Sequence, residues 1–208
     1  MTEIPVSGTA HQQQFEQVQR QIRACIACVD AGFIERAMPI FQGHTGQRLM
    51  IIGQAPAWRN EETPPYSGAS GRRLQGWMEQ AGFPPGSLHE RFYLTSLTKC
   101  FPGVSKSGKG DRAPGTAEIA LCCPNLESEL AFVQPEVIIT LGRLSAKRFL
   151  GNRPLSAIVG HRFDVDGHVV LPLPHPSGVS RWLNDPENQK QVDRALELLS
   201  ELRQQLDL

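Results

Sequence analysis

Four short apolar runs dominate the hydrophobic pattern of this chain, and a glycine, a proline or a polar turn follows each of them. The runs cover residues 49–52, 92–97, 137–141 and 169–173. Runs of this length without polar alternation are typical of parallel strands that are buried on both faces. We therefore predict four buried strands at these positions.

Apolar residues between these runs recur at helical spacing. The pattern predicts helices over 11–27, 70–81, 116–133 and 144–150, and a closing helix that starts at Asp185-Pro186-Glu187 and runs through Leu202. Residues 161–168 are predicted to form a turn or hairpin around Asp166-Gly167. Strands that alternate with helices indicate an α/β fold, here a three-layer α/β/α sandwich with a central four-stranded parallel sheet.

Length and charge limit the possible functions. The chain has 208 residues with 21 basic and 21 acidic side chains, so any contact with nucleic acid must come from a local patch. We expect a flexible N-terminus at 1–10 and one domain over 11–208. No apolar run is long enough to span a membrane, and the first residues lack the pattern of a secretory signal. We therefore expect a cytoplasmic protein without membrane partners.

Five cysteines need an explanation that suits the cytoplasm, where stable disulfides are rare. Cys25 and Cys28 form a C-x-x-C pair, whose two sulfurs can reach one metal centre. The alternative is that these thiols are buried and behave as small apolar side chains.

Three loops carry candidate chemistry. Residues 53–56 (GQAP) and 175–178 (HPSG) each follow a predicted strand, which places them at the carboxyl edge of a parallel sheet, where ligands bind. Residues 104–115 contain Lys106, Lys109 and Arg112 among glycines and serines. Such a loop is either a solvated surface turn or a contact to phosphates.

Taken together, these motifs resemble the uracil-DNA glycosylase superfamily, especially its iron–sulfur families four and five. The resemblance rests on GQAP with PYSGASG (65–71), on Lys99-Cys100 with Arg112-Ala113-Pro114, on EIALC (118–122) and on HPSG. It implies a monofunctional DNA glycosylase of base excision repair. Such an enzyme flips uracil, or another deaminated base, out of DNA and hydrolyses its N-glycosidic bond, leaving an abasic site. We expect a monomer associated with a prokaryotic nucleoid.

The resemblance also implies roles for single residues. Tyr66 would stack on the flipped base, Ser96 would touch the base edge, and His175 would donate a hydrogen bond to the base carbonyl as the glycosidic bond lengthens. Gln54, with the backbone of Gly53, Ala55 and Pro56, would hold the base or the water. The alternative for Tyr66 and His175 is a purely structural role in the core.

For the cofactor, the resemblance implies that four cysteines hold a [4Fe–4S] cluster with a structural role, and that Cys123 is left over. The implied ligands are Cys25, Cys28, Cys100 and Cys122. The same four sulfurs suit a structural zinc ion, which stays open as the alternative.

DNA contacts are expected on two loops. Lys106, Lys109 and Arg112 would meet phosphates. The loop after the histidine, residues 179–183, would enter the duplex. Arg181 would bind a phosphate, and Val179 or Trp182 would be the wedge. Ser177 and Gly178, directly before this loop, are also expected to contact DNA.

Three positions depart from the family pattern. Gln54 stands where family four carries a glutamate, and Ala55 where family one carries an aspartate. Family five also lacks an acid in this loop, and Glu61 or Glu62, later in the same loop, could compensate. Ser96 replaces an asparagine that pairs with uracil, which opens the site to bases such as hypoxanthine. One alternative is therefore a non-catalytic or covalently trapping DNA-binding member of the superfamily, and another is a nucleotide-binding α/β protein with a zinc site.

Overall fold

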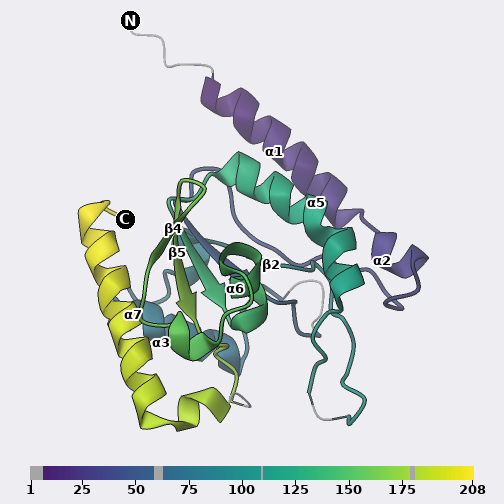
Figure 1. Ribbon diagram of the computed structural model, residues 1–208. Coiled ribbons are helices and arrows are strands. Elements are labelled where there is room, and N and C mark those ends of the chain that lie inside the picture. Colours follow the sequence, from purple (N-terminus) through teal and green to yellow (C-terminus); the bar gives the residue numbers. More distant parts are fainter. Residues whose placement is uncertain (1–6, 59–62, 109, 179–180) are drawn as a thin grey trace, which may run out of the picture.

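The computed structural model describes residues 7–58, 63–108, 110–178 and 181–208 and is built on one sheet (Figure 1). Its strands are β1 (Leu49–Gly53), β2 (Phe92–Ser96), β3 (Val137–Leu141), β4 (Phe163–Val165) and β5 (His168–Leu173), in the order β2-β1-β3-β5-β4. The pairs β1–β2, β1–β3 and β3–β5 are parallel, whereas β4 is antiparallel to β5. The four predicted parallel strands are confirmed.

The predicted strand count of four was wrong, because the sheet is five-stranded. The additional strand, β4, is the first arm of the hairpin expected at 161–168, and Asp166 takes the left-handed backbone conformation in its turn. It has only three residues, and its middle residue is exposed. So short an edge strand produces no continuous apolar run, and the hydrophobic pattern therefore shows only its turn.

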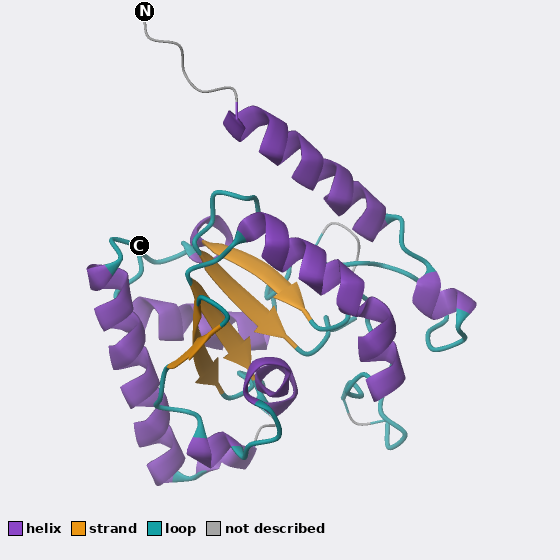
Figure 2. Cartoon of the chain, turned by 45° about the horizontal axis from the view of Figure 1, so that its top comes forward, coloured by secondary structure: helices purple, strands orange, loops and turns teal. Residues whose placement is uncertain are grey.

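Helices cover both faces of the sheet, as Figure 2 shows. One face carries α3 (Ala69–Gln80) and α7 (Pro186–Gln205), whose side chains pack against Leu49, Ile51 and Ile139. The other face carries α1 (Ser7–Arg23), α5 (Thr116–Val133) and α6 (Arg143–Leu150), which pack against Met50 and Ile52. Because alternate residues of one strand enter opposite cores, the strand is apolar throughout, and the predicted three-layer sandwich is confirmed.

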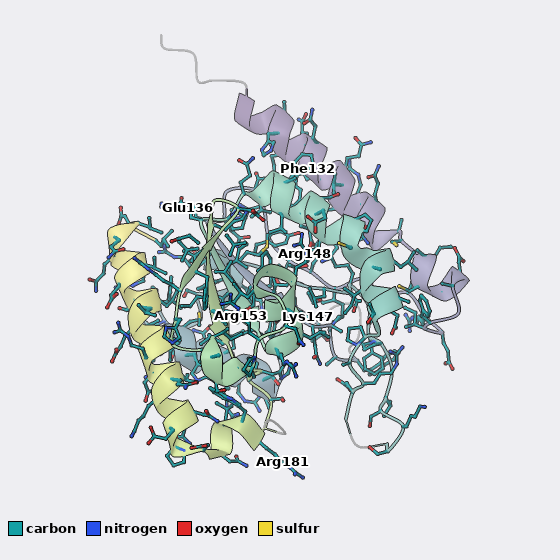
Figure 3. All side chains as sticks on the ribbon, in the orientation of Figure 1. Phe132, Glu136, Lys147, Arg148, Arg153 and Arg181 are labelled. Atoms are coloured by element: carbon teal, nitrogen blue, oxygen red, sulfur yellow. The ribbon has the colours of Figure 1, made fainter. Side chains whose placement is uncertain are left out.

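The N-terminal segment differs in detail from the prediction. Helix α1 begins at Ser7 and ends at Arg23, and a separate short helix, α2 (Ala27–Asp30), follows it. Phe132 of α5, labelled in Figure 3, stacks on the ring of Phe15 at a centroid distance of 5.5 Å. This contact holds α1 against α5 and brings the C-x-x-C pair near the start of α5.

Short elements complete the chain. They are α4 (Leu88–Arg91), η1 (Leu155–Ala157) and η2 (Arg181–Asn184). Within the described ranges, no helix combines the length and the apolar character that crossing a bilayer requires.

The connections after β1 and β3 run to opposite faces of the sheet. Helix α3 follows β1 on one face, and α6 follows β3 on the other. Two neighbouring parallel strands whose connections diverge leave a crevice beyond their carboxyl ends, and this is where open α/β sheets bind ligands. The topology therefore places the loop at 53–56 at the entrance of such a crevice.

Candidate functional site

A pocket of about 470 Å³ lies beyond the carboxyl ends of β1 and β2. Its wall combines the end of β2 at 95–96 with four loops that are far apart in sequence, around 54–57, 65–70, 102–112 and 175–177. Many of the residues singled out in the sequence line it: Gln54, Ala55, Pro56, Tyr66, Ser96, Arg112, His175 and Ser177. The strand ends thus bring together motifs that no local pattern connects.

Two glycines fix the position of Tyr66. A Cβ atom on Gly53 would lie 2.6 Å from the Tyr66 hydroxyl, and one on Gly71 would lie 1.4 Å from the Tyr66 carbonyl oxygen. Tyr66 itself takes a left-handed backbone conformation with φ 58°. Gly53 therefore contributes space for the tyrosine rather than a wall of the pocket, and the turn locks the ring against the end of β1.

His175 presents a defined tautomer. The backbone N–H of Ser177 donates to His175 Nδ1 at 3.2 Å, so Nδ1 is an acceptor and the ring proton is on Nε2. Burial lowers the pKa of His175 below its usual value of 6.5, and the negative charge of Asp111 opposes this effect. The ring is accordingly a neutral donor at neutral pH.

Ser96 ends β2 and is almost completely buried. Its hydroxyl donates to the carbonyl of Thr98 at 2.8 Å, which uses the only proton of that group. The oxygen keeps lone pairs, so toward the pocket Ser96 is a hydrogen-bond acceptor.

A buried ion pair supports this strand end from behind. Lys99 Nζ lies 2.6 Å from Glu129 Oε2, and the two side chains are 1% and 0% exposed. Lys99 also donates to Thr95 Oγ1 and to the Ser96 carbonyl, each at 2.7 Å, and Tyr93 donates to Glu129 at 3.0 Å. Burial, and then the Glu129 charge, raise the pKa of Tyr93. Every polar atom of the pair therefore has a partner beneath the pocket.

The predicted cluster ligands come together from four segments. Cys25 lies between α1 and α2, Cys28 in α2, Cys100 after β2 and Cys122 in α5. The side-chain amide of Asn125 lies 4.0 Å from the Cys25 sulfur and 3.7 Å from the Cys122 sulfur.

Two of these thiols, Cys28 and Cys100, have a pKa above the usual value for cysteine. Burial raises the pKa of Cys100 to about 11, and the neighbouring thiols Cys122, Cys28 and Cys25 add to this, while a backbone hydrogen bond with Met38 opposes it. Burial and the same neighbours also raise the pKa of Cys28. Within the described parts of the chain, however, no three His, Cys, Asp or Glu side chains are close enough to enclose a single metal ion.

The loop between β2 and α5 is a small hairpin anchored at its base. Arg112 pairs with Glu118 through both terminal nitrogens, at 2.7 and 2.8 Å, and also donates to the Phe33 carbonyl at 3.1 Å. The paired guanidinium lowers the pKa of Glu118. In the structure Arg112 is thus an anchor of the loop. Phosphate contacts by Arg112 and by the exposed Lys106 stay predictions.

The remaining predicted residues lie around the mouth of the pocket or outside the described residues. The Ser177 carbonyl accepts from Arg73 at 3.4 Å, and Gly178 lines a neighbouring cavity with Trp77. Arg181 opens η2, and its side chain extends away from the body of the protein (Figure 3). Four predicted residues lie outside the described ranges: Glu61, Glu62, Lys109 and Val179.

Sequence reasoning missed two contributors to the pocket. Thr95 lies before Ser96, and Asp111 lies within the loop that we expected to be basic. Asp111 is the only acidic residue between 103 and 115, directly before the Arg-x-Pro motif. This isolated charge was the signal that could have identified it.

Comparison with known proteins agrees with this geometry. The family model of the uracil DNA glycosylase superfamily matches residues 40–200. A type-4 uracil-DNA glycosylase from Sulfurisphaera tokodaii is 28% identical over 64% of this chain and 56% of its own length. One from Saccharolobus solfataricus is 31% identical over 60% and 54%, and one from Thermotoga maritima is 25% identical over 80% and 83%.

The matched region thus spans little more than half of the two archaeal relatives and most of the bacterial one. The family match, by contrast, covers the whole sheet and every loop that builds the pocket. The chain therefore belongs to the uracil DNA glycosylase superfamily.

Proposed function

We propose that the chain is a monofunctional DNA glycosylase that removes uracil from DNA by hydrolysis of the N-glycosidic bond and leaves an abasic site. The observation that carries this proposal is a pocket that combines an aromatic ring, Tyr66, with a neutral histidine donor, His175. The similar proteins named type-4 uracil-DNA glycosylase support the same reaction.

In the proposed reaction, the base leaves the duplex and stacks on Tyr66. His175 Nε2–H donates to the carbonyl oxygen next to the glycosidic nitrogen. The bond between C1′ and this nitrogen breaks, and its electron pair goes to the base, which departs as an anion. The hydrogen bond to His175 strengthens as this negative charge develops, and this lowers the barrier. Water then adds to C1′ and loses a proton.

Ser96 supports selection of deaminated bases. Its oxygen accepts a hydrogen bond, because its proton is held by Thr98. Uracil and hypoxanthine both present an N–H at the ring position where cytosine and adenine present a lone pair. A hydrogen-bond acceptor at Ser96 therefore favours the deaminated bases, even though the chain lacks the asparagine amide of the family-four pattern. Hypoxanthine is the second candidate substrate.

We further propose that Cys25, Cys28, Cys100 and Cys122 hold a [4Fe–4S] cluster. Thiolate donors from four segments and nearby N–H groups, including the Lys99 backbone N–H at 3.3 Å from the Cys122 sulfur, suit such a cluster. When bound, it would join the N-terminal helices to the sheet as a structural link. In a cluster each thiolate binds a different iron, so the sulfurs need not converge on one point as they must on zinc.

The cluster prediction has a matched pair of variants in adjacent positions. Protein purified without oxygen is expected to be brown and to contain iron and sulfide in equal amounts. Cys122→Ser should reduce both, whereas Cys123→Ser should leave them unchanged, because Cys123 contacts Glu127 at 3.4 Å instead. Absorption spectra with iron, sulfide and zinc analysis make the measurement. One zinc per chain in colourless protein would contradict the cluster.

Single-turnover cleavage tests the proposed function. Single- and double-stranded oligonucleotides that carry uracil, hypoxanthine or xanthine would be incubated with excess protein and treated with alkali to reveal abasic sites. We expect cleavage at uracil. Specific binding without cleavage of any substrate would instead favour the alternative, a lesion-binding protein without turnover; a complex with DNA that survives denaturation would indicate covalent trapping.

A further inference from the structure

The pocket contains an acid that the known loop motifs do not supply. Among the described residues that line it, Asp111 alone carries a carboxylate. The first loop contributes Gln54 and Ala55 to the pocket, and neither carries a charge. The inference that follows rests on the proposed function and names a further residue for that reaction.

The loop that carries Asp111 is held in a fixed shape. Backbone N–H groups of Ser105 and Arg112 donate to the carbonyls of Gly110 and Gly103, at 2.9 and 3.0 Å, and Val104 and Asp111 form an antiparallel bridge. The hairpin places Asp111 at the wall of the pocket. The next residue, Arg112, forms the ion pair with Glu118 that anchors the loop.

The anchor also determines the charge of the site. Arg112 follows Asp111 directly, yet its guanidinium is bound by Glu118 in a two-point ion pair. The guanidinium of Arg112, which also lines the pocket, is thus neutralised by Glu118, and Asp111 lines the same cavity as His175. The negative charge of Asp111 raises the pKa of His175, against the larger lowering by burial. Both groups therefore face the same volume from opposite loops.

We propose that Asp111 is a catalytic residue that binds the attacking water and accepts its proton. In this step the water oxygen forms a bond to C1′ after the bond from C1′ to the base has broken and its electron pair has left with the base. One water proton goes to the Asp111 carboxylate and then to the departing base anion or to solvent. The carboxylate also stabilises the positive charge that C1′ carries in the transition state.

The test compares variants of Asp111 in single-turnover cleavage of uracil-containing DNA. Asp111→Asn and Asp111→Ala are expected to cleave about 10²–10⁴-fold more slowly, the range for loss of a general base. DNA binding should be unchanged or tighter, because a negative charge near phosphates is removed. Asp164→Asn, an exposed acid on the edge strand β4, is the control and should cleave at the normal rate.

Added formate separates a catalytic from a structural role. Asp111→Ala leaves a space in which a small carboxylate can bind, so formate should restore part of its activity and leave Asp111→Asn unaffected. Normal cleavage by Asp111→Asn would overturn the catalytic role of Asp111 and leave the proposed function in place. Loss of cleavage by Asp111→Ala without restoration by formate would have the same meaning. If the unaltered protein cleaved no substrate, the proposed function and the catalytic role of Asp111 would both be overturned.

Discussion

Replacing His175 with alanine should lower single-turnover cleavage of uracil-containing DNA by about 10²–10³-fold, the usual cost of removing one donor to a developing anion. The fold should remain, because the only described side-chain hydrogen bond of His175 is the one that it accepts from the Ser177 backbone. Cleavage rates, with circular dichroism as a check on folding, make the measurement. His161→Ala is the control, since His161 is exposed and lies outside the pocket.

The pH dependence of cleavage distinguishes a neutral donor from an imidazolium. Burial lowers the pKa of His175, so the ring loses its proton at a pH below its usual value of 6.5. We therefore expect no loss of rate attributable to His175 as pH rises through this value. If the reaction needed the protonated ring, the rate would instead fall as pH rises through the lowered pKa of His175, below 6.5, and this fall would disappear in His175→Ala.

The same shift has a consequence for stability with a defined sign. In the unfolded chain the histidine takes up its proton at a higher pH than in the folded chain. Between the two pKa values the unfolded state binds more protons, so the free energy of unfolding decreases as pH falls below 6.5 toward the lowered folded value. The His175→Ala variant should lack this contribution, which denaturation at several pH values would show.

Replacing Lys99 with methionine should reduce the free energy of unfolding by about 3–5 kcal/mol, the cost of leaving one charge of a buried pair without its partner. Glu129 is completely buried, and without Lys99 it keeps only hydroxyl donors from Tyr93 and Thr95. Chemical denaturation of protein with a matched cofactor content measures the change. A loss near zero would show that water or a shift of the chain neutralises the burial of Glu129.

Two further variants isolate the cause. Lys99→Met combined with Glu129→Leu removes both charges, so it should recover much of the stability that the single variant loses. Arg148→Met breaks a pair with Glu127 on the surface, where both side chains are about 40% exposed, and should cost only about 0–1 kcal/mol. Because Lys99 also binds the Ser96 carbonyl, the single variant should in addition cleave more slowly, even where it remains folded.

The four parallel strands could be predicted because each is buried on both faces, which makes its sequence apolar throughout. Strand β4 could not, since Phe163–Val165 is short and half-exposed, and the early start of α1 lies among residues with little apolar periodicity. Such elements depend on tertiary contacts, here the pairing with β5 and the stacking of Phe15 on Phe132, which local patterns do not contain.

The candidate site was predictable where a motif marks a strand end, as for Tyr66 and His175. It was not predictable where a long-range contact directs a side chain. Arg112 is a residue type that suits a phosphate, yet its guanidinium binds Glu118, and it is the adjacent Asp111 that adds a negative charge to the pocket wall. The sequence shows which residues are charged, whereas only the packing of the folded chain shows which groups their side chains contact.

The wall of the pocket comes from segments that are far apart in sequence, so the pocket is completed late during synthesis of the chain. The segments that contain Gln54, Tyr66 and Ser96 leave the ribosome well before His175. His175 follows β5, the last parallel strand. Strand β5 pairs with β3, so the sheet that carries these loops is also completed late. A nascent chain therefore lacks part of the wall of this pocket until His175 has emerged.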